Sequence, residues 1–310
     1  MLIPSIQSQI TKESMPHPAP IRTLPPTPAP TLHWFSRTLL VLIVLAPLAL
    51  TPPAHAANPL SGSPLNDGYH DLYNLAFPAA HQHFQQWMNA HPEDPMGPAA
   101  DAAAYLFSEF DRLHIIDVEL FADQTRFDNR QRLTPDPAVR KAFDDRVAQA
   151  ALLADAAIQR NPRDASAYYV KTLLAGMRSD YALLIEKRDI TALNLSKEAS
   201  AYSKQALSLN PTLYDAYLAS GVENYMLSLK SAPLRWILGL TGAATDREEG
   251  IRLLHITASQ GFYLAPFARM MLAVAALRDN HPQEARNILL ALQKEYPQNT
   301  VYARQIERIP

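Results

Sequence analysis

The sequence has 310 residues, a formal net charge of −2 and no cysteine. Because proteins that bind nucleic acid neutralise phosphates with an excess of lysine and arginine, this charge balance argues against a nucleic-acid partner. The absence of cysteine excludes disulfides, thiolate nucleophiles and cysteine-ligated metals.

The first segment, residues 1–33, is rich in proline and low in charge. It contains eight prolines and three charged residues, a composition that does not build a packed core. We therefore expect a disordered leader over this segment. A start at Met15 instead of Met1 would leave a signal peptide of more ordinary length.

Residues 38–50 form a 13-residue uncharged run that follows Arg37 and precedes Ala54-His55-Ala56. A positive charge, an apolar run and small residues in this order are typical of an export signal. The run is shorter than the roughly 20 apolar residues that a membrane-spanning helix needs. We expect a signal peptide over 34–56, cleaved near Ala56, and a periplasmic or secreted protein in a bacterium. The alternative is an uncleaved anchor, which would be the chain's contact with the membrane.

Residues 57–135 predict an irregular helical region. A helix or a helix pair is expected over 71–90, broken at Phe77-Pro78, and another helix over 99–111. Proline disfavours the helical conformation in the residue before it, which is the reason for placing the break there. Residues 113–136 follow no helical pattern and are acidic.

Histidine is concentrated in this region, where His70, His81, His83 and His91 lie within 22 positions. His81 and His83 are two residues apart on an expected helix, so they point to nearly opposite faces and do not share a metal. Glycine-rich phosphate loops, the serine elbow and the His-Glu-x-x-His zinc motif are absent from the sequence. We therefore expect a protein that is not an enzyme, with no catalytic residues, no metal and no cofactor.

Helix start signals recur along residues 136–310. Asp136-Pro137 supplies a cap and a first-turn proline to a long helix whose apolar face carries Phe143 and Ala150. Few windows show the strict alternation of a half-buried strand, so we expect an all-α fold. The other start signals are Asp164, Thr212-x-x-Asp215, Thr245-x-x-Glu248 and Pro282.

Two Asn-Pro dipeptides, Asn161-Pro162 and Asn210-Pro211, each end an alanine-rich helix and precede a tyrosine-bearing one. With these prolines as the reference, the segment from about 146 to 301 resembles tetratricopeptide repeats, helical hairpins of about 34 residues with small residues where helices touch. The resemblance implies a right-handed superhelical stack of antiparallel hairpins, a TPR-like α-solenoid, over 136–310. The small residues that carry it are Ala150, Ala157, Ala199, Ala206 and Gly221.

The spacing departs from a regular array. Pro162 and Pro211 are 49 residues apart, and Pro211 and Pro297 are 86 apart, so we expect insertions near 178–190 and 230–245. Residues 233–254 are also similar to the carboxy-terminal units of Iml2-like repeat proteins.

The concave groove of a repeat array is its usual binding surface, lined by the first helix of each hairpin. Here the predicted lining is apolar, without the lysine, arginine and asparagine that clamp a peptide terminus. Either the amino-terminal helices fill the groove, or it accepts an apolar segment or acyl group. We favour self-filling, because a large exposed apolar patch is a liability in a soluble protein. The predicted groove residues are Tyr169, Leu173, Leu218, Val222, Tyr225, Phe267 and Met270.

Three functions are compatible with this reading. The leading hypothesis is an exported, non-catalytic scaffold that mediates protein–protein interaction in the cell envelope, with a protein or peptide as its partner. The second is a carrier or chaperone that binds an apolar ligand or peptide in the groove. The third, least favoured, is a hydrolase that uses the amino-terminal histidines and aspartates.

Overall fold

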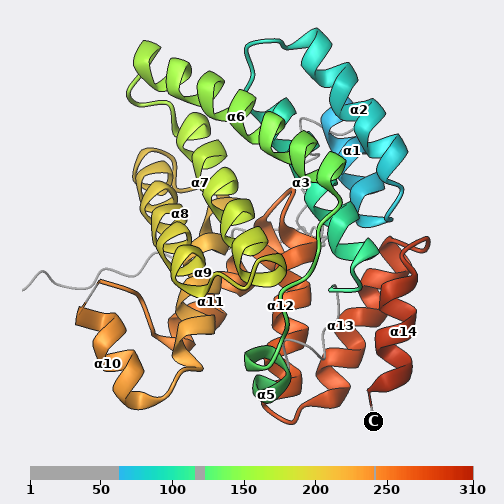
Figure 1. Cartoon of the computed structure of the whole chain (residues 1–310), viewed down its shortest axis with the longest axis vertical. Coiled ribbons are helices and arrows are strands. Elements are labelled where there is room, and N and C mark those ends of the chain that lie inside the picture. Colours follow the sequence, from blue (N-terminus) through green and yellow to red (C-terminus); the bar gives the residue numbers. More distant parts are fainter. Residues whose placement is uncertain (1–62, 116–122, 241, 310) are drawn as a thin grey trace, which may run out of the picture. The chain divides into compact units, whose positions relative to one another are not determined.

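The computed structural model describes residues 63–115, 123–240 and 242–309, and every regular element in these ranges is a helix (Figure 1). The all-α prediction is therefore confirmed. The chain divides into two units, Met1–Ala54 and His55–Pro310, and the described residues belong to the second. The expected leader and signal peptide lie outside the described residues. Among the helices described, none has the length and hydropathy to cross a membrane.

The helices fall into two groups along the chain. The first group comprises α1 (Pro64–Tyr73), α2 (Phe77–Ala90), α3 (Met96–Arg112) and the short α5 (Gln124–Asp128). The second comprises α6 (Pro137–Arg160), α7 (Ala165–Asp180), α8 (Asp189–Leu209), α9 (Tyr217–Ser228), α11 (Arg247–Gln260), α12 (Ala265–Arg278), α13 (Pro282–Glu295) and α14 (Thr300–Arg308). In the second group each helix packs against the next, as expected for a stack of hairpins.

The break between α1 and α2 lies earlier in the chain than expected. Leu75 has a positive φ of 60°, a conformation that ends a helix. Pro78 is in the first turn of α2, where its missing N–H costs no hydrogen bond. Of the two predicted possibilities, a helix or a helix pair, the structure has the pair, and the break lies before Phe77-Pro78.

Both expected insertions are present. The first extends α7 into a π-helical turn, η1 (Tyr181–Ile185), before α8 begins. The second adds α10 (Ala232–Leu240) between α9 and α11, and Figure 1 shows α10 at the edge of the helix array. These additions explain why the two proline intervals exceed one repeat.

Helix capping follows the sequence at some positions and departs from it at others. Asp136 accepts from the N–H groups of Ala138 and Val139, and Asp164 accepts from Ala167, as predicted. The cap of α11 is Asp246, not Thr245, because the Asp246 carboxylate accepts from the Glu249 N–H at 3.1 Å. The sequence therefore placed this cap one residue too early in the chain.

Thr212-x-x-Asp215 does not form the predicted capping arrangement. A short 3₁₀ turn, η2 (Tyr214–Ala216), precedes α9 instead. The buried Asp215 carboxylate accepts from the N–H groups of Phe262, Tyr263 and Leu264, at 2.7, 2.9 and 3.1 Å. It therefore fixes the loop that leads into α12, one hairpin further along the chain.

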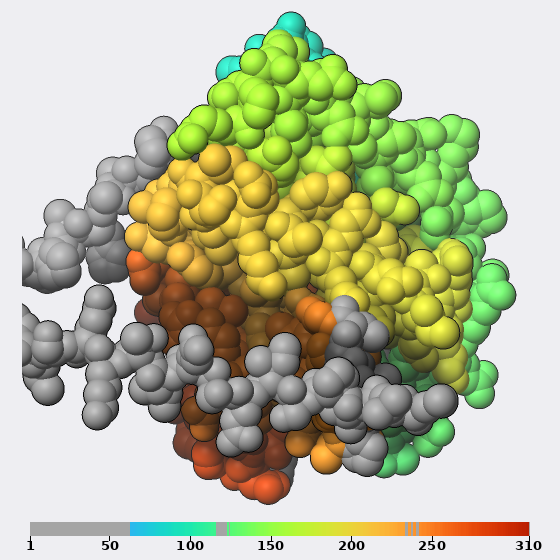
Figure 2. Space-filling model, turned by 90° about the vertical axis from the view of Figure 1, so that its left-hand side faces the viewer, coloured from blue at the N-terminus to red at the C-terminus, as the bar shows by residue number. Residues whose placement is uncertain are grey.

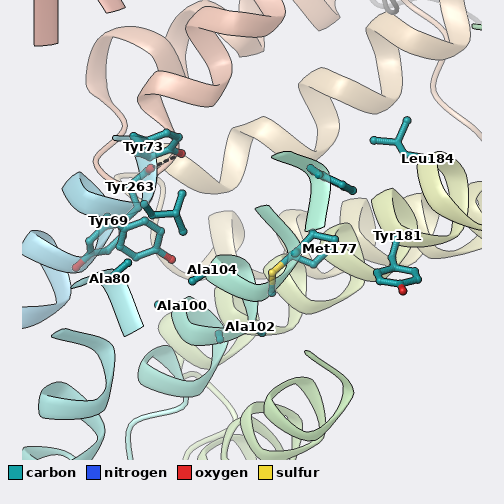
Figure 3. Packing of buried hydrophobic residues seen from close by; sticks show 14 of the residues in the cluster. Tyr69, Tyr73, Ala80, Ala100, Ala102, Ala104, Met177, Tyr181, Leu184 and Tyr263 are labelled. Atoms are coloured by element: carbon teal, nitrogen blue, oxygen red, sulfur yellow. Dashed lines mark hydrogen bonds between the residues drawn. The ribbon is translucent and has the colours of Figure 1, made fainter. Parts of the chain in front are cut away.

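Small residues bring helices close together at two places. Ala99, Ala100, Ala102 and Ala104 of α3 are almost fully buried, and α3 packs against α2, α6 and α7 (Figure 3). Gly221 of α9 meets α11 as predicted: a Cβ there would lie 3.3 Å from the Gly250 carbonyl oxygen. The two glycines face each other where the helices cross.

The amino-terminal helices also contact the last helices of the array. The Tyr69 ring stacks on Tyr263, with centroids 4.4 Å apart, and the Tyr73 hydroxyl donates to the Tyr263 carbonyl at 2.8 Å (Figure 3). The loop between α13 and α14 is bound as well, since the Asn299 amide donates to the Tyr73 carbonyl and Asn74 accepts from the Gln298 N–H. The amino-terminal helical region is thus tied to the far end of the stack. The main hydrophobic core includes residues of both groups of helices, and a second, smaller cluster lies between α9, α11 and α12.

Candidate functional site

A cavity of about 490 Å³ lies among the first helices of the hairpins. α7, α9 and α12 form one wall, α8 contributes a second, and α1 and α3 close it from the amino-terminal side. Most of its lining is aliphatic or aromatic. The apolar lining includes Leu72, Tyr73, Ala103, Phe107, Leu173, Met177, Leu193, Leu218, Ala219, Val222, Met226 and Phe267.

Four of the seven predicted groove residues meet at this cavity: Leu173 of α7, Leu218 and Val222 of α9, and Phe267 of α12. Tyr225 does not, because it is fully buried at the crossing of α9 with α11. Met270 packs against the core. Tyr169 lies at a second cavity of about 740 Å³, near the buried Asp215.

The amino-terminal helices fill part of the predicted groove, and part of it stays open. Phe107 of α3 packs edge to face on Phe267 of α12, with centroids 6.2 Å apart, so the amino-terminal helices do occupy part of the groove. Space remains between them and α9. Open space also lies beside Gly176 of α7, because a Cβ added there would have no atom within 4 Å.

The cations that line the cavity each have a carboxylate partner. Arg130 pairs with Asp189 and also donates to the Leu183 carbonyl. Lys230 lies 3.5 Å from Asp128. Neither positive charge is therefore available, without rearrangement, to neutralise another group in the lining.

Three carboxylates of the lining, Asp180 on α7, Asp215 in η2 and Glu223 on α9, form no ion pair with a described residue, and Asp215 is held by three backbone N–H groups instead. Glu223 is buried and accepts a backbone N–H from Ala244 at 3.4 Å. Burial raises the pKa of Asp180 to about 7, because transfer from water into apolar surroundings disfavours the charged form. The cavity therefore has an apolar lining with an excess of acidic groups.

Exposed apolar side chains lie close to this cavity. Ile190, at the start of α8, lines it and is 79% exposed. α10 contributes Leu238 to the lining and presents Trp236, which is 69% exposed. Figure 2 shows α8 in yellow, between the green residues of α6 and α7 and the orange to red residues that follow α9.

The amino-terminal histidines hold structural partners. His81 Nδ1 lies 2.6 Å from Asp101, which also accepts from Arg146, so this pair links α2 and α3 to α6. His83 lies 3.5 Å from Asp71 of α1. The two histidines thus have separate partners, in keeping with their predicted opposite directions. Within the described ranges, no group of three histidine, cysteine, aspartate or glutamate residues is placed to hold a metal ion.

The chain was compared with protein families, curated proteins and solved structures. No family model matches the chain, and no curated protein matches it. Among solved structures, a thermophilic TPR protein of Thermus thermophilus is similar, with a TM-score of 0.40 and 18% sequence identity. The similarity covers 79% of this chain and 96% of that one. These comparisons give no support to the similarity with Iml2-like repeat proteins.

Sequence reasoning missed Asp180 as a residue of the site. The signal was present, because Leu173, Gly176, Asp180 and Leu183 recur at helical spacing and all line the cavity. The repeat register stopped short of Asp180, since the expected insertion was placed from residue 178 onward. In the structure, α7 continues directly into η1, so the cavity-facing side of the helix extends through the insertion.

Proposed function

We propose that this protein is a non-catalytic carrier that holds the apolar part of a ligand in the cavity between α3, α7, α9 and α12. The observation that supports this function is the volume of about 490 Å³ behind a predominantly apolar lining. Ligand pockets of proteins are usually about 300–1,000 Å³ and carry a few polar groups on apolar walls. A carrier of this kind needs no cofactor.

The size of the cavity favours a ligand over a packing defect. Protein interiors are packed as densely as organic crystals and contain few voids larger than a water molecule. Small residues keep this space open, since Ala103, Gly176 and Ala219 lie on three different helices around it. An apolar guest would recover the dispersion contacts that the lining lacks when the cavity is empty.

Gly176→Phe tests this function, because Gly176 lines the cavity and a Cβ added there meets no atom within 4 Å. We expect the variant to bind a fluorescent apolar probe such as N-phenyl-1-naphthylamine at least about tenfold more weakly than the wild type, since the ring occupies the same volume. Titration of probe fluorescence measures the affinity. The unfolding midpoint should not fall, because the substitution fills empty space.

The matched control is Gly239→Phe on α10, where a Cβ also meets no atom within 4 Å and the residue does not line the cavity. It adds the same ring outside the cavity and should leave the probe affinity unchanged. Equal affinities for wild type and Gly176→Phe would refute the carrier function.

A protein-contact scaffold is the second candidate, favoured by the exposed Trp236 and Ile190. Tryptophan is enriched among the residues that contribute most to protein interfaces. In this function the cavity plays no part. A wild-type protein that binds no apolar probe, and that loses copurifying partners on Trp236→Ser, would favour the scaffold over the carrier.

We also propose that the protein is exported from a bacterial cell, on the basis of the 13-residue apolar run before Ala54-His55-Ala56. Expressed with its own leader in a bacterium, it is expected in the periplasmic or secreted fraction with an amino terminus near Ala57. Amino-terminal sequencing of the recovered protein measures this. Full-length protein in the cytosolic fraction would contradict export.

A further inference from the structure

We propose that the cavity selects amphiphiles that carry one protonated amine, with the alkyl chain against the apolar lining and the ammonium group at Asp180. This inference rests on the proposed carrier function and adds the chemical class of the ligand.

Asp180 lies on the cavity-facing side of α7. It is one helical turn beyond Gly176 and about one turn before Leu183, and all three line the cavity. The residue keeps accessible surface although it is surrounded by buried neighbours such as Ser179 and Tyr181. Asp180 is half-buried and lines the cavity, and its carboxyl has no hydrogen-bond or ion-pair partner in the described part of the chain.

The charge balance of the lining favours a cationic head group. Asp189 and Asp128 are neutralised by Arg130 and Lys230, and Asp215 is held by three backbone N–H groups. Asp180 and Glu223 stay without a counter-charge among the described residues. A single ammonium group at Asp180 would supply the missing positive charge.

The same balance disfavours the other common amphiphiles. A fatty-acid carboxylate would add a further acidic group next to Asp180 and Glu223, and like charges repel strongly where the dielectric is low. A fatty alcohol would gain the burial of its chain but no ion pair. Burial raises the pKa of Asp180 to about 7, and a nearby cation favours the ionised carboxylate.

Three probes with the same decyl chain separate these contributions: decylamine, decanol and decanoate. Each is titrated into the purified protein at pH 8, below its micellar concentration, by displacement of the fluorescent probe. We expect decylamine to bind at least about tenfold more tightly than decanol, and decanoate to bind more weakly than decanol.

Asp180→Asn preserves the shape of the side chain and removes its charge. It should abolish the preference for decylamine while decanol binds as in the wild type. Glu223→Gln should weaken the preference without abolishing it. Asp145→Asn changes the net charge equally on the exposed side of α6, where Asp145 pairs with Lys141, and should retain wild-type selectivity.

The outcomes distinguish the two proposals. Equal binding of the three probes, or a preference for decylamine that Asp180→Asn retains, overturns the selectivity and leaves the carrier function standing. Failure of all three probes to displace the dye overturns both. The wild-type series needs no variant, so the inference is testable even if Asp180→Asn does not fold.

Discussion

Gly250→Ala is expected to lower the free energy of unfolding by about 3 kcal/mol, the upper part of the usual range for overpacking a close contact. Gly250 lies where α11 crosses α9, and a Cβ there would stand 2.6 Å from the Tyr225 backbone nitrogen and 3.0 Å from the Gly221 carbonyl oxygen. Backbone atoms within a helix cannot move aside as a flexible side chain does. The helices would have to separate, and urea unfolding monitored by circular dichroism measures the loss.

Gly176→Ala is the matched control for this prediction. It makes the same substitution within a helix, but the added methyl group meets no atom within 4 Å. Alanine restricts the unfolded chain more than glycine does, so this variant should gain about 0.4–1 kcal/mol. Equal stabilities of Gly250→Ala and Gly176→Ala would contradict the close packing of α9 against α11 at Gly250.

Asp215→Ala is expected to cost about 4 kcal/mol. The substitution leaves the N–H groups of Phe262, Tyr263 and Leu264 without their acceptor, and each buried unsatisfied donor costs roughly 1–3 kcal/mol. The residue itself is 7% exposed. Chemical denaturation measures the loss of unfolding free energy. The amide exchange rates of these three residues should increase more than those elsewhere in the chain.

Asp215→Asn provides the graded comparison, because its amide keeps one acceptor oxygen. It should lose less stability than Asp215→Ala, and Asp145→Ala on the exposed side of α6 should lose almost none. Equal losses for Asp215→Ala and Asp145→Ala would show that the carboxylate does not hold the loop before α12.

Local signals in the sequence predicted local structure well. Asp136 and Asp164 cap the helices that they precede because a cap needs only the next two or three N–H groups. Thr245 and Asp246 are adjacent candidates for one cap, and the pattern favoured the wrong one. Asp215 was mispredicted for a different reason: its partners are 47 to 49 residues away, and no local pattern reports such a contact.

The candidate site was likewise predicted where its residues follow the repeat register, and missed where distant segments meet. Leu173, Leu218, Val222 and Phe267 were predicted to share a groove from the repeat register, and they do line one cavity. Tyr225 does not line it, because the residue is fully buried where α11 approaches α9 closely at Gly250. The part played by α1 and α3 in closing the cavity depends on contacts between distant segments, which the register does not contain.

The attachment of α1 to the loop between α13 and α14 restricts the gain or loss of repeats in this array. In an open solenoid each repeat contacts only its neighbours, so repeats can be gained or lost at an end with little effect elsewhere. Here Asn74 and Asn299 join segments more than 220 residues apart in the chain. An added hairpin would carry α14 away from α1 and expose the tyrosines between them, so the number of repeats in this protein is fixed by its own closure.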